Sequence, residues 1–480
     1  MNDPNGLVFW EGEYHLFYQA HPASTLWGPM HWGHAVSPDL VNWRHLPLAL
    51  SPDALGTIFS GSAIIDQANT AGFGADALVA AFTHDRDGAQ TQSLAYSLDR
   101  GRAWTKYPAN PVLAGPNDLK DFRDPKIFWF PAGDGGGHWV MLLAAGDRVL
   151  IYTSPDLKRW APASAFGPGY GETAGVWETP ELLHLPVDGG PQTRWVLAVG
   201  VQKGAPAGGS GTQYFIGQFD GRAFASDYPP ETVLWADYGA DFYAAQAWND
   251  APGGRHLWAA WLNNWDYARQ VPTAAWRGAL TLPRELSLAS TLQGPRLVQQ
   301  PIVELQRLRG QHWTWRNVSL PAAAGLLQAI RGDTLEIIAE FQVDAATCAN
   351  CFGLRLRVGA PGGVGQHTTI GYLPGSSRLF VDRTQSGAVD FGPGFAAAHT
   401  APLAPMGQTI RLHIFVDRSS VEVFGNDGLI SLTDQIFPAA ASLGLEAFSD
   451  GGSVIVTALE VFHLTPAQFQ SDPGSSRFGV

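Results

Sequence analysis

A pattern of serine, aspartate and a following aromatic residue recurs along the first part of the chain and constrains its fold more than any other feature. Its copies are Ser37-Pro38-Asp39 to Trp43, Ser97-Leu98-Asp99 to Trp104, Ser154-Pro155-Asp156 to Trp160, and a looser one from Asp220 to Phe224. The aromatic positions are 56 to 64 residues apart, a length that suits one four-stranded blade of a β-propeller. Continuing the period to the region of Pro283 predicts a fifth blade.

Short apolar or alternating runs, bounded by Gly, Pro and Asp, separate these copies and indicate strands. The clearest are residues 138–143, 149–153, 195–199, 214–219 and 256–261. No long amphipathic pattern typical of a helix competes with them. We therefore predict an all-β fold that begins with a five-bladed β-propeller over residues 1–293.

The pattern changes at residues 294–310, which we predict to be a linker with one short helical turn at Val303–Leu308. Beyond it, alternating strands between residues 335 and 432 follow one another at the intervals of a β-sandwich and lack the blade repeat. We therefore predict a C-terminal β-sandwich over residues 311–480. The length of 480 residues also favours two domains.

Three acidic residues occupy similar local settings early in successive repeats. Asp3, Asp124 and Glu178 are each followed by proline within two positions, and Ser60 holds a comparable place in the second repeat. Because the innermost strand of each blade runs beside the central axis, radial repetition should bring these side chains to the mouth of one pocket. A single Asp-Pro pair is most often a surface turn, so this hypothesis depends on the three acids together.

Two carboxyl groups that face each other across a pocket are the minimum apparatus of a glycosidase. One attacks the sugar or activates water, and the other protonates the leaving oxygen. Asp3 and Asp124 have polar neighbours in the sequence, which favours their ionised forms, whereas Glu178 follows Val176-Trp177, an apolar setting that favours a bound proton. We therefore predict that Glu178 is the acid/base.

Charge and composition argue against several classes of partner. The net charge of −13 argues against a nucleic acid, and no run of about 18 apolar residues predicts a membrane span. Cys348 and Cys351 are too few for a disulfide framework, and one C-x-x-C pair without further ligands does not predict a metal site, so we expect no metal or cofactor. The oligomeric state stays open.

The localisation depends on the start of the chain. No charged and then apolar signal precedes the first motif, which predicts a cytoplasmic protein as printed, or a secreted one if an upstream segment is missing.

Four blocks follow one another along the chain: Met1–Gly6, Phe59–Ile64, Phe122–Phe128 and Trp177–Leu182. They stand in the order found in glycoside hydrolase family 32, the β-fructofuranosidases, and the chain resembles that family. Further segments resemble its levanase and exo-inulinase branch, namely Tyr18-Gln19, Trp27–His34, Asp241–Gln246, Trp261–Tyr267 and Trp276–Gly278. Ser419–Phe424 is similar to the family's C-terminal sandwich, so the resemblance covers nearly the whole chain.

The resemblance implies a five-bladed propeller followed by a sandwich, and hydrolysis of terminal β-fructosyl units from levan, inulin or sucrose with retention and without a metal. By matching motif positions, Asp3 would be the nucleophile, Asp124 would hydrogen-bond the fructosyl hydroxyls in the transition state, and Glu178 would be the acid/base. Seven further residues would line the subsite for the terminal sugar: Asn2, Gln19, Trp27, Phe59, Ser60, Arg123 and Trp265.

Two departures from the family pattern carry expectations of their own. The family commonly has cysteine directly after the acid/base, where this chain has Thr179, so the resemblance implies a shifted pH optimum. Family members also carry a short segment before the first block, which implies that Met1 corresponds to an internal position of a longer protein.

Other readings of the same residues remain open. A sucrose-preferring invertase or a fructosyltransferase of the same family would use the same acids. A sialidase would share the Ser97–Trp104 turn, but it needs a cluster of arginines that does not recur at equivalent positions here. A non-catalytic propeller lectin would bind fructan without cutting it, and the presence of all three acids argues against that reading.

Overall fold

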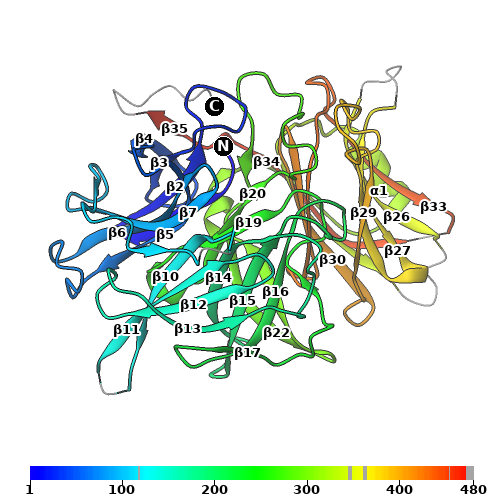
Figure 1. The fold of residues 1–480 in the computed structure, drawn as a ribbon. Helices are drawn as coiled ribbons and strands as arrows, with labels where there is room; N and C mark the ends of the chain where they lie inside the picture. The colour runs from blue at the N-terminus through cyan, green and yellow to red at the C-terminus, as the bar shows by residue number, and fades with distance from the viewer. Residues whose placement is uncertain (117–118, 134, 344–348, 360–364, 453, 472–480) are drawn as a thin grey trace.

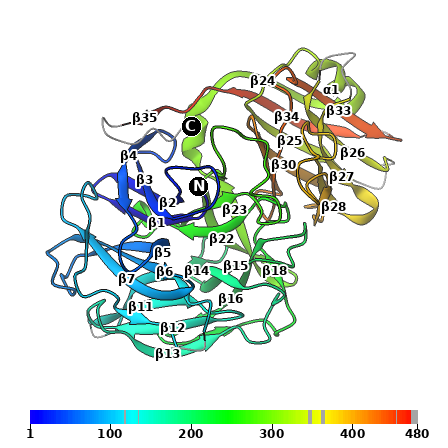
Figure 2. The same ribbon diagram turned by 45° about the horizontal axis from the view of Figure 1, so that its top comes forward.

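The computed structural model describes residues 1–116, 119–133, 135–343, 349–359, 365–452 and 454–471, and strands dominate it (Figures 1 and 2). Five sheets form the N-terminal part of the described chain, and two further sheets form the C-terminal part. The helices of the described residues are α1 (Leu320–Leu327) and the 3-10 helices η1 (Pro252–Gly254), η2 (Val303–Leu308) and η3 (Pro374–Ser376). None of these is long and apolar enough to cross a membrane.

Each N-terminal sheet is built from consecutive strands, in keeping with the sequence repeat. The first contains β1 (Pro4–Trp10), β2 (Glu13–Ala20), β3 (His31–Ser37) and β4 (Trp43–Leu50). The second contains β5 (Thr57–Asp66), β6 (Ala77–Arg86), β7 (Ala89–Ser97), β8 (Thr105–Lys106) and β9 (Leu113–Ala114). The third contains β10 (Arg123–Pro131), β11 (Gly137–Ala144), β12 (Val149–Ser154) and β13 (Ala161–Phe166).

The last two sheets of this part continue the order. The fourth contains β14 (Trp177–Pro186), β15 (Thr193–Val201), β16 (Gly211–Phe219), β17 (Phe224–Ser226) and β18 (Leu234–Trp235). The fifth contains β19 (Tyr243–Ala247), β20 (Leu257–Leu262), β21 (Ala279–Leu280), β22 (Arg284–Thr291) and β23 (Gly294–Pro301).

The first strands of the five sheets contact one another in chain order, and β19 returns to β1, so the sheets form a closed ring. Asn249 makes the closure: its amide donates to the carbonyl of Leu7 (2.9 Å), and the amide of Phe9 donates to the carbonyl of Asn249 (3.0 Å). Its side-chain nitrogen also donates to the carbonyl of Ala63 in the second sheet (2.7 Å). Closure of this kind removes the free edges that an open row of sheets would have.

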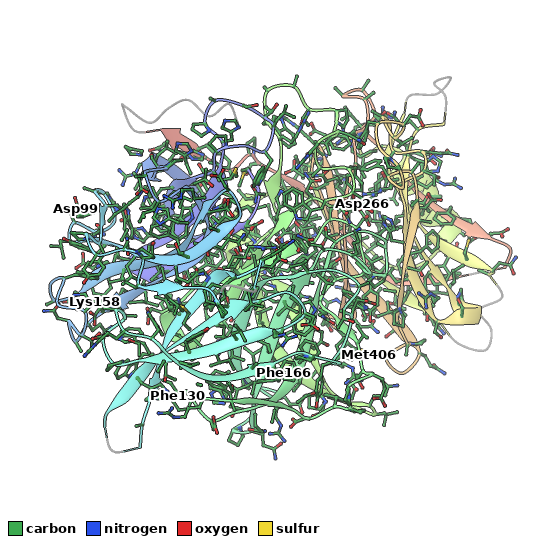
Figure 3. All side chains as sticks on the ribbon, viewed as in Figure 1. Asp99, Phe130, Lys158, Phe166, Asp266 and Met406 are labelled. Atoms are coloured by element: carbon green, nitrogen blue, oxygen red, sulfur yellow. The ribbon has the colours of Figure 1, made fainter. Side chains whose placement is uncertain are left out.

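The repeated Ser-x-Asp motif forms the turn between the last long strands of a sheet. In the first copy the Asp39 carboxylate accepts the amide of Asn42 (2.8 Å), and the Trp43 indole donates to the carbonyl of Leu40 (3.2 Å). The indole of Trp104 makes the equivalent bond in the second copy (3.0 Å), where Asp99 lies at the periphery of the ring (Figure 3). These are local contacts, which explains why the repeat is legible in the sequence.

A second repeat lies at the opposite end of each sheet and positions the pocket. Every innermost strand carries a β-bulge close to its start, at Asn5/Val8, Ile58/Gly61, Arg123/Lys126, Glu178/Glu181 and Tyr243/Gln246. In four strands the bulge includes a residue with φ between 46° and 62°: Gly6, Asp124, Thr179 and Ala244. A bulge bends the strand and redirects its side chains, and here the bulges turn side chains from different sheets toward one cavity.

The boundary of the first domain lies later than the sequence predicts. Residues 294–301, assigned to the linker, form β23, which pairs with β22 along its whole length. The connection after it is short and contains η2, in agreement with the predicted helical turn at Val303–Leu308. The strand escapes recognition because Gln299 is buried: its amide side chain is inside, where an alternating pattern would have an apolar residue.

The remainder is a sandwich of two sheets, which confirms the predicted class of a propeller followed by a sandwich. One sheet contains β24 (Arg309–Ser319), β34 (Ile455–Leu464), β25 (Leu335–Gln342), β30 (Thr409–Val416), β31 (Ser420–Gly425) and β32 (Ile430–Gln435). The other contains β29 (Ala398–Pro402), β28 (Arg378–Asp382), β27 (Thr368–Leu373), β26 (Cys351–Val358) and β33 (Gly444–Asp450). β35 (Phe469–Ser471) returns to the first sheet and pairs in parallel with β4.

The predicted Cys348–Cys351 motif lies partly outside the described residues. Cys351 begins β26 and is half-buried, whereas Cys348 is not described. The structural interpretation of this pair therefore stays a prediction.

Buried charges join the two domains. We call them the interface cluster: Asp237, Asp241 and Arg284 from the propeller, and Arg383, Glu422 and Asp434 from the sandwich. Arg284 donates to Asp237 (3.1 Å) and to Glu422 (2.8 Å). Arg383 donates to Asp241 (2.6 Å), so each domain supplies an arginine to an acid of the other.

Candidate active site

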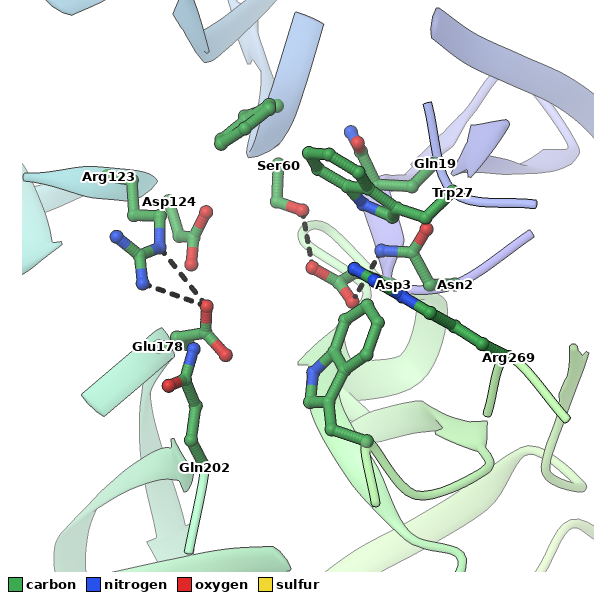
Figure 4. A pocket seen from close by; sticks show the side chains of 12 residues that line it. Asn2, Asp3, Gln19, Trp27, Ser60, Arg123, Asp124, Glu178, Gln202 and Arg269 are labelled. Carbon is green, nitrogen blue, oxygen red and sulfur yellow. Dashed lines mark hydrogen bonds and ion pairs between the residues drawn. The ribbon is translucent and has the colours of Figure 1, made fainter. Parts of the chain in front are cut away.

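A cavity of about 240 Å³ lies where the bulged ends of the inner strands converge (Figure 4). It is lined by Asn2, Asp3, Gln19, Trp27, Phe59, Ser60, Arg123, Asp124, Glu178, Gln202, Trp265 and Arg269. All ten residues singled out in the sequence line it, and Gln202 and Arg269 are additional. Four of the five inner strands, or the residues just before them, contribute to the lining, as radial repetition predicts.

The backbone around Asp3 is fixed by pairing with the second strand. The amide of Asn2 donates to the carbonyl of Gln19 (3.2 Å), and the amide of Gln19 donates to the carbonyl of Asp3 (3.0 Å), which continues the β1–β2 ladder beyond Pro4. Asn5 bridges two sheets, because its side chain donates to the Asp3 carbonyl (2.6 Å) and accepts the amide of Gly61 (3.0 Å).

Both oxygens of the Asp3 carboxylate are held in place. Ser60 Oγ donates to Oδ2 (2.6 Å) and Asn2 Nδ2 donates to Oδ1 (3.0 Å) (Figure 4). Burial raises the pKa of Asp3 to about 6, and the nearby charge of Glu178 adds to the rise, while the two hydrogen bonds oppose it. The carboxylate is thus rigid and easier to protonate than an exposed aspartate.

Asp124 occupies the bulge of the third sheet, with φ of 62°. Its amide donates to Thr83 Oγ1 (3.0 Å), and its Oδ2 accepts the amide of Thr179 (2.9 Å) from the bulge of the fourth sheet. Burial raises the pKa of Asp124, and the charges of Glu178 and Asp3 raise it further, against the opposing effect of Arg123.

The sequence predicts an apolar setting for Glu178, and this prediction is wrong. Arg123 donates to its Oε1 from Nε (3.2 Å) and Nη2 (2.9 Å), and the hydroxyl of Tyr243 donates to its Oε2. Neighbouring side chains in a strand point to opposite faces, so the fully buried Trp177 packs into the core while Glu178 faces the polar cavity. The expectation that Asp3 and Asp124 have settings favouring ionisation is wrong as well, because burial raises both pKa values.

Tyr243 is a residue that the sequence reasoning missed. It lies at the start of the bulge in β19, the position that Glu178 holds in β14. The resemblance of the segment Asp241–Gln246 to the family does not single out this side chain. The positional repeat of the bulges would have identified it, since equivalent positions in a propeller face the same axis.

Two potential donors in the pocket wall have no hydrogen-bond partner among the described residues. They are Nε2 of Gln19 and the indole nitrogen of Trp265, both buried. Trp265 is fixed by its amide, which donates to Ser210 Oγ (3.1 Å), and by its packing on Trp261 (ring centroids 4.7 Å apart). Buried donors normally find partners, so both are suited to accepting groups of a ligand such as sugar hydroxyls.

Aromatic rings form the outer wall. Trp27 is 46% exposed and contacts Phe59 edge-to-face, with ring centroids 5.9 Å apart. A polar floor with carboxylates and an aromatic wall is the arrangement expected for a carbohydrate subsite. Among the described residues, no cluster of His, Cys, Asp and Glu has the geometry of a metal site.

Comparison with known families agrees with this geometry. Residues 1–301 match the model for the glycosyl hydrolases family 32 N-terminal domain, and residues 304–463 match the model for the C-terminal domain of the same family. This chain belongs to glycosyl hydrolase family 32. The resemblance noted in the sequence is therefore confirmed, and this family 32 chain carries its three acids in one pocket.

Individual relatives extend the comparison. A levanase of Bacillus subtilis (strain 168) is 52% identical over 472 residues, which cover 97% of this chain and 68% of that protein. A levanase of Bacillus sp. (strain L7) is 41% identical, and the match covers 96% of this chain but half of that protein's length. The crystal structure of exo-inulinase from Aspergillus awamori superposes with a TM-score of 0.89 at 37% identity, covering 97% of this chain and 96% of that one.

Proposed function

We propose that this chain is a retaining, exo-acting β-fructosidase that releases terminal fructosyl units from levan, inulin and sucrose. The observation that carries the proposal is the placement of Asp3 and Glu178 in one small cavity, each carboxylate held by two side chains. The similarity to proteins named levanase and exo-inulinase supports fructan as the substrate, in preference to a sucrose-only invertase, a transferase or a lectin.

In the proposed first step, Asp3 attacks the anomeric carbon of the terminal fructosyl unit. The bond to the leaving oxygen breaks, Glu178 gives its proton to that oxygen, and a covalent fructosyl ester forms on Asp3. In the second step, water donates a proton to Glu178 and attacks the same carbon, which frees fructose and restores Asp3. Two displacements on one carbon retain its configuration.

The charges of the pocket are consistent with a proton held there at the start. Of the three carboxylates, only Glu178 is hydrogen-bonded to a guanidinium, that of Arg123, which also donates to Asp121 (2.6 Å). Burial and mutual repulsion therefore favour protonation of one member of the group. We assign this proton to Glu178 once a substrate oxygen is next to it, and we assign Asp124 to the sugar hydroxyls.

The size of the cavity supports removal of single units. About 240 Å³ is below the range of typical drug-sized ligand sites and suits one furanose ring. We expect fructose to be the dominant early product from levan, inulin and sucrose. Chromatography of early time points tests this: long oligosaccharides before fructose would indicate an open cleft, and no release from any substrate would favour the lectin reading.

Stereochemistry tests the role of Asp3. For a nucleophile we expect its carboxyl to lie about 5 to 5.5 Å from that of Glu178, and NMR of the first product should show a retained configuration. An inverted product would assign Asp3 to a base that acts through water instead.

Chemical rescue separates the two acids. Azide should restore part of the activity of a Glu178→Ala variant with an activated aryl fructoside, because the ester on Asp3 still forms and azide needs no general base. The matched Asp3→Ala variant should show no such rescue with retained configuration. Rescue of both variants to the same product would contradict the assignment.

A further inference from the structure

The two bulges that carry Asp124 and Glu178 are built alike. Each is a segment of four residues with proline at the third position, Arg123-Asp124-Pro125-Lys126 in β10 and Glu178-Thr179-Pro180-Glu181 in β14. The second residue of each segment has a positive φ, 62° at Asp124 and 46° at Thr179. Proline cannot donate to a strand ladder but is tolerated at a bulge. Two of the three pocket acids therefore stand on copies of one irregular backbone segment.

The two segments carry opposite charges at both ends, and they pair at both ends. At the start of the bulges, Arg123 Nη2 donates to Glu178 Oε1 (2.9 Å), a contact inside the pocket (Figure 4). At the end of the bulges, Lys126 Nζ forms an ion pair with Glu181 Oε2 (2.9 Å). The third and fourth sheets are thus joined by one ion pair on each side of the bulged residues.

The second ion pair lies inside the protein and not in the pocket. The side chain of Lys126 is 3% exposed, that of Glu181 is 0% exposed, and neither lines the cavity. Glu181 Oε2 also accepts the amide of Ala247 in β19 (2.8 Å), and Lys126 Nζ donates to the carbonyl of Ala247 (3.2 Å). Glu181 Oε1 accepts the amide of Leu182 (3.0 Å). Both charged groups are therefore tied to backbone atoms of the neighbouring strands.

Stability does not by itself explain a buried pair of this kind. Taking two charges out of water costs about as much as their attraction returns, so apolar residues of similar size often stabilise a core equally well. The bulges, however, need support. A positive φ is costly at Asp124 and more so at the β-branched Thr179, and such backbone persists only where the surrounding contacts hold it. An ion pair that joins the ends of both bulges is a contact of that kind.

We propose that Lys126 and Glu181 are positioning residues, which lock the two bulges together and so fix where the carboxyl groups of Asp124 and Glu178 stand relative to the substrate. This inference rests on the proposed function, in which Glu178 protonates the leaving oxygen. Neither positioning residue touches the substrate. A misplacement of about 1 Å can lower a rate about a hundredfold, so a pair behind the pocket is able to control turnover.

A double variant separates positioning from stability. Lys126→Met combined with Glu181→Gln leaves no buried charge, and the glutamine keeps an oxygen for a backbone amide. We expect its thermal unfolding temperature to stay within about 3 °C of the wild-type value. Its kcat on sucrose should fall at least about tenfold. On an activated aryl β-D-fructofuranoside the fall should be smaller, because a good leaving group needs little protonation by Glu178.

Two control variants make the result specific. Arg309→Met combined with Glu336→Gln makes the same kind of replacement at an ion pair of the sandwich whose glutamate is also buried (2.6 Å), and it should leave kcat on both substrates unchanged. Lys126→Arg keeps the positive charge and should retain more activity than Lys126→Met. A role in folding alone would not distinguish the two leaving groups.

Three outcomes would overturn the inference. They are a wild-type kcat in the double variant, the same fold loss on both substrates, and a comparable loss of kcat in the sandwich control. A fall in unfolding temperature as large as that of Lys126→Met alone, which leaves Glu181 buried without its cation, would also overturn it, because the pair would then be a structural contact. A wild-type protein that cleaves neither substrate would overturn the proposed function instead.

Discussion

The pocket and the interface cluster both bury several acids, but they balance the charge differently. In the pocket, Glu178 is the only one of the three acids that pairs with an arginine, Arg123. In the interface cluster, four acids are matched by Arg284 and Arg383, and Asp434 also accepts His399 (2.6 Å). Burial raises the pKa of acids in both places, for example Asp241 and Glu422 in the interface cluster.

A raised pKa therefore does not distinguish a chemical site from a structural one in this protein. In the interface cluster, Asp241 has both oxygens occupied: it accepts Arg383, the Tyr267 hydroxyl (2.6 Å) and the amide of Gln435 (2.8 Å). The pocket acids face a cavity, and Arg269, the second arginine in its lining, forms an ion pair with none of them. Several negative charges next to an open cavity therefore distinguish the active site from the interface cluster, because only a bound substrate can complete the contacts of these acids.

The largest expected effect is a loss of activity without a loss of stability when a pocket acid is replaced. Asp3→Asn and Glu178→Gln should each lower kcat by about a thousandfold or more, because they remove a nucleophile or a proton donor. The thermal unfolding temperature of Asp3→Asn should not fall, since it loses a repelling charge, and that of Glu178→Gln should change little, because Arg123 keeps its bond to Asp121. Steady-state kinetics and calorimetry measure both quantities. A marked loss of stability in either variant would mean that the pocket acids are structural, like those of the interface cluster.

The interface cluster should behave in the opposite way. Arg383→Met leaves Asp241 and Asp434 buried without their cation, which costs about 3 to 5 kcal/mol of unfolding free energy. The control is Arg411→Met, which breaks an exposed pair with Asp427 (2.6 Å) and should cost about 0 to 1 kcal/mol. Urea unfolding gives the free energy of unfolding of both variants. Equal costs would show that the interface pairs contribute no more than surface pairs.

The raised pKa of Asp3 should make both catalysis and stability depend on pH. A nucleophile has to be ionised, so kcat/KM should fall as the pH drops through about 6. The pKa is higher in the folded state than the unfolded value of 3.8, so the folded state binds the extra proton between these values. The ionised side chain thus destabilises the fold above about pH 6, and this penalty disappears below about pH 4.

Asp3→Asn tests that linkage. The variant should be more stable than the wild type at pH 7, and the difference should vanish near pH 4, as measured by urea unfolding at both values. Comparison of the two proteins cancels the contribution of other groups, such as the buried His15. A difference that does not depend on pH would mean that the carboxylate is unperturbed.

The smallest effect is expected at Thr179, beside the acid/base. Its hydroxyl has no hydrogen-bond partner among the described residues, and the groups that contact the Glu178 carboxyl are Arg123 and Tyr243. Thr179→Cys should therefore move the pH optimum by less than about half a unit, which corresponds to less than 1 kcal/mol. A larger shift, seen in a pH–rate profile, would restore the expectation that this position tunes the acid.

The sequence by itself determined the features that depend on short-range contacts. The Ser-x-Asp turns close on themselves within a few residues, so their spacing predicts sheets of one size arranged radially. Asp3, Asp124 and Glu178 follow from the same regularity, because each stands early in its repeat. Family resemblance added the subsite residues, and the cavity contains all of them.

Only the tertiary structure decided what depends on contacts across the ring and between domains. Arg123 reaches Glu178 across 55 positions, and Arg284 reaches Glu422 across 138. Burial among the sheets raises the pKa values of Asp3 and Asp124, against the expectation from their neighbours in the chain. The ring also places the Tyr243 hydroxyl on the acid/base and buries Gln299 in a strand that the sequence predicts to be part of a linker. Residues adjacent in a strand point to opposite faces, so the environment of a side chain is set by other sheets and not by its sequence neighbours.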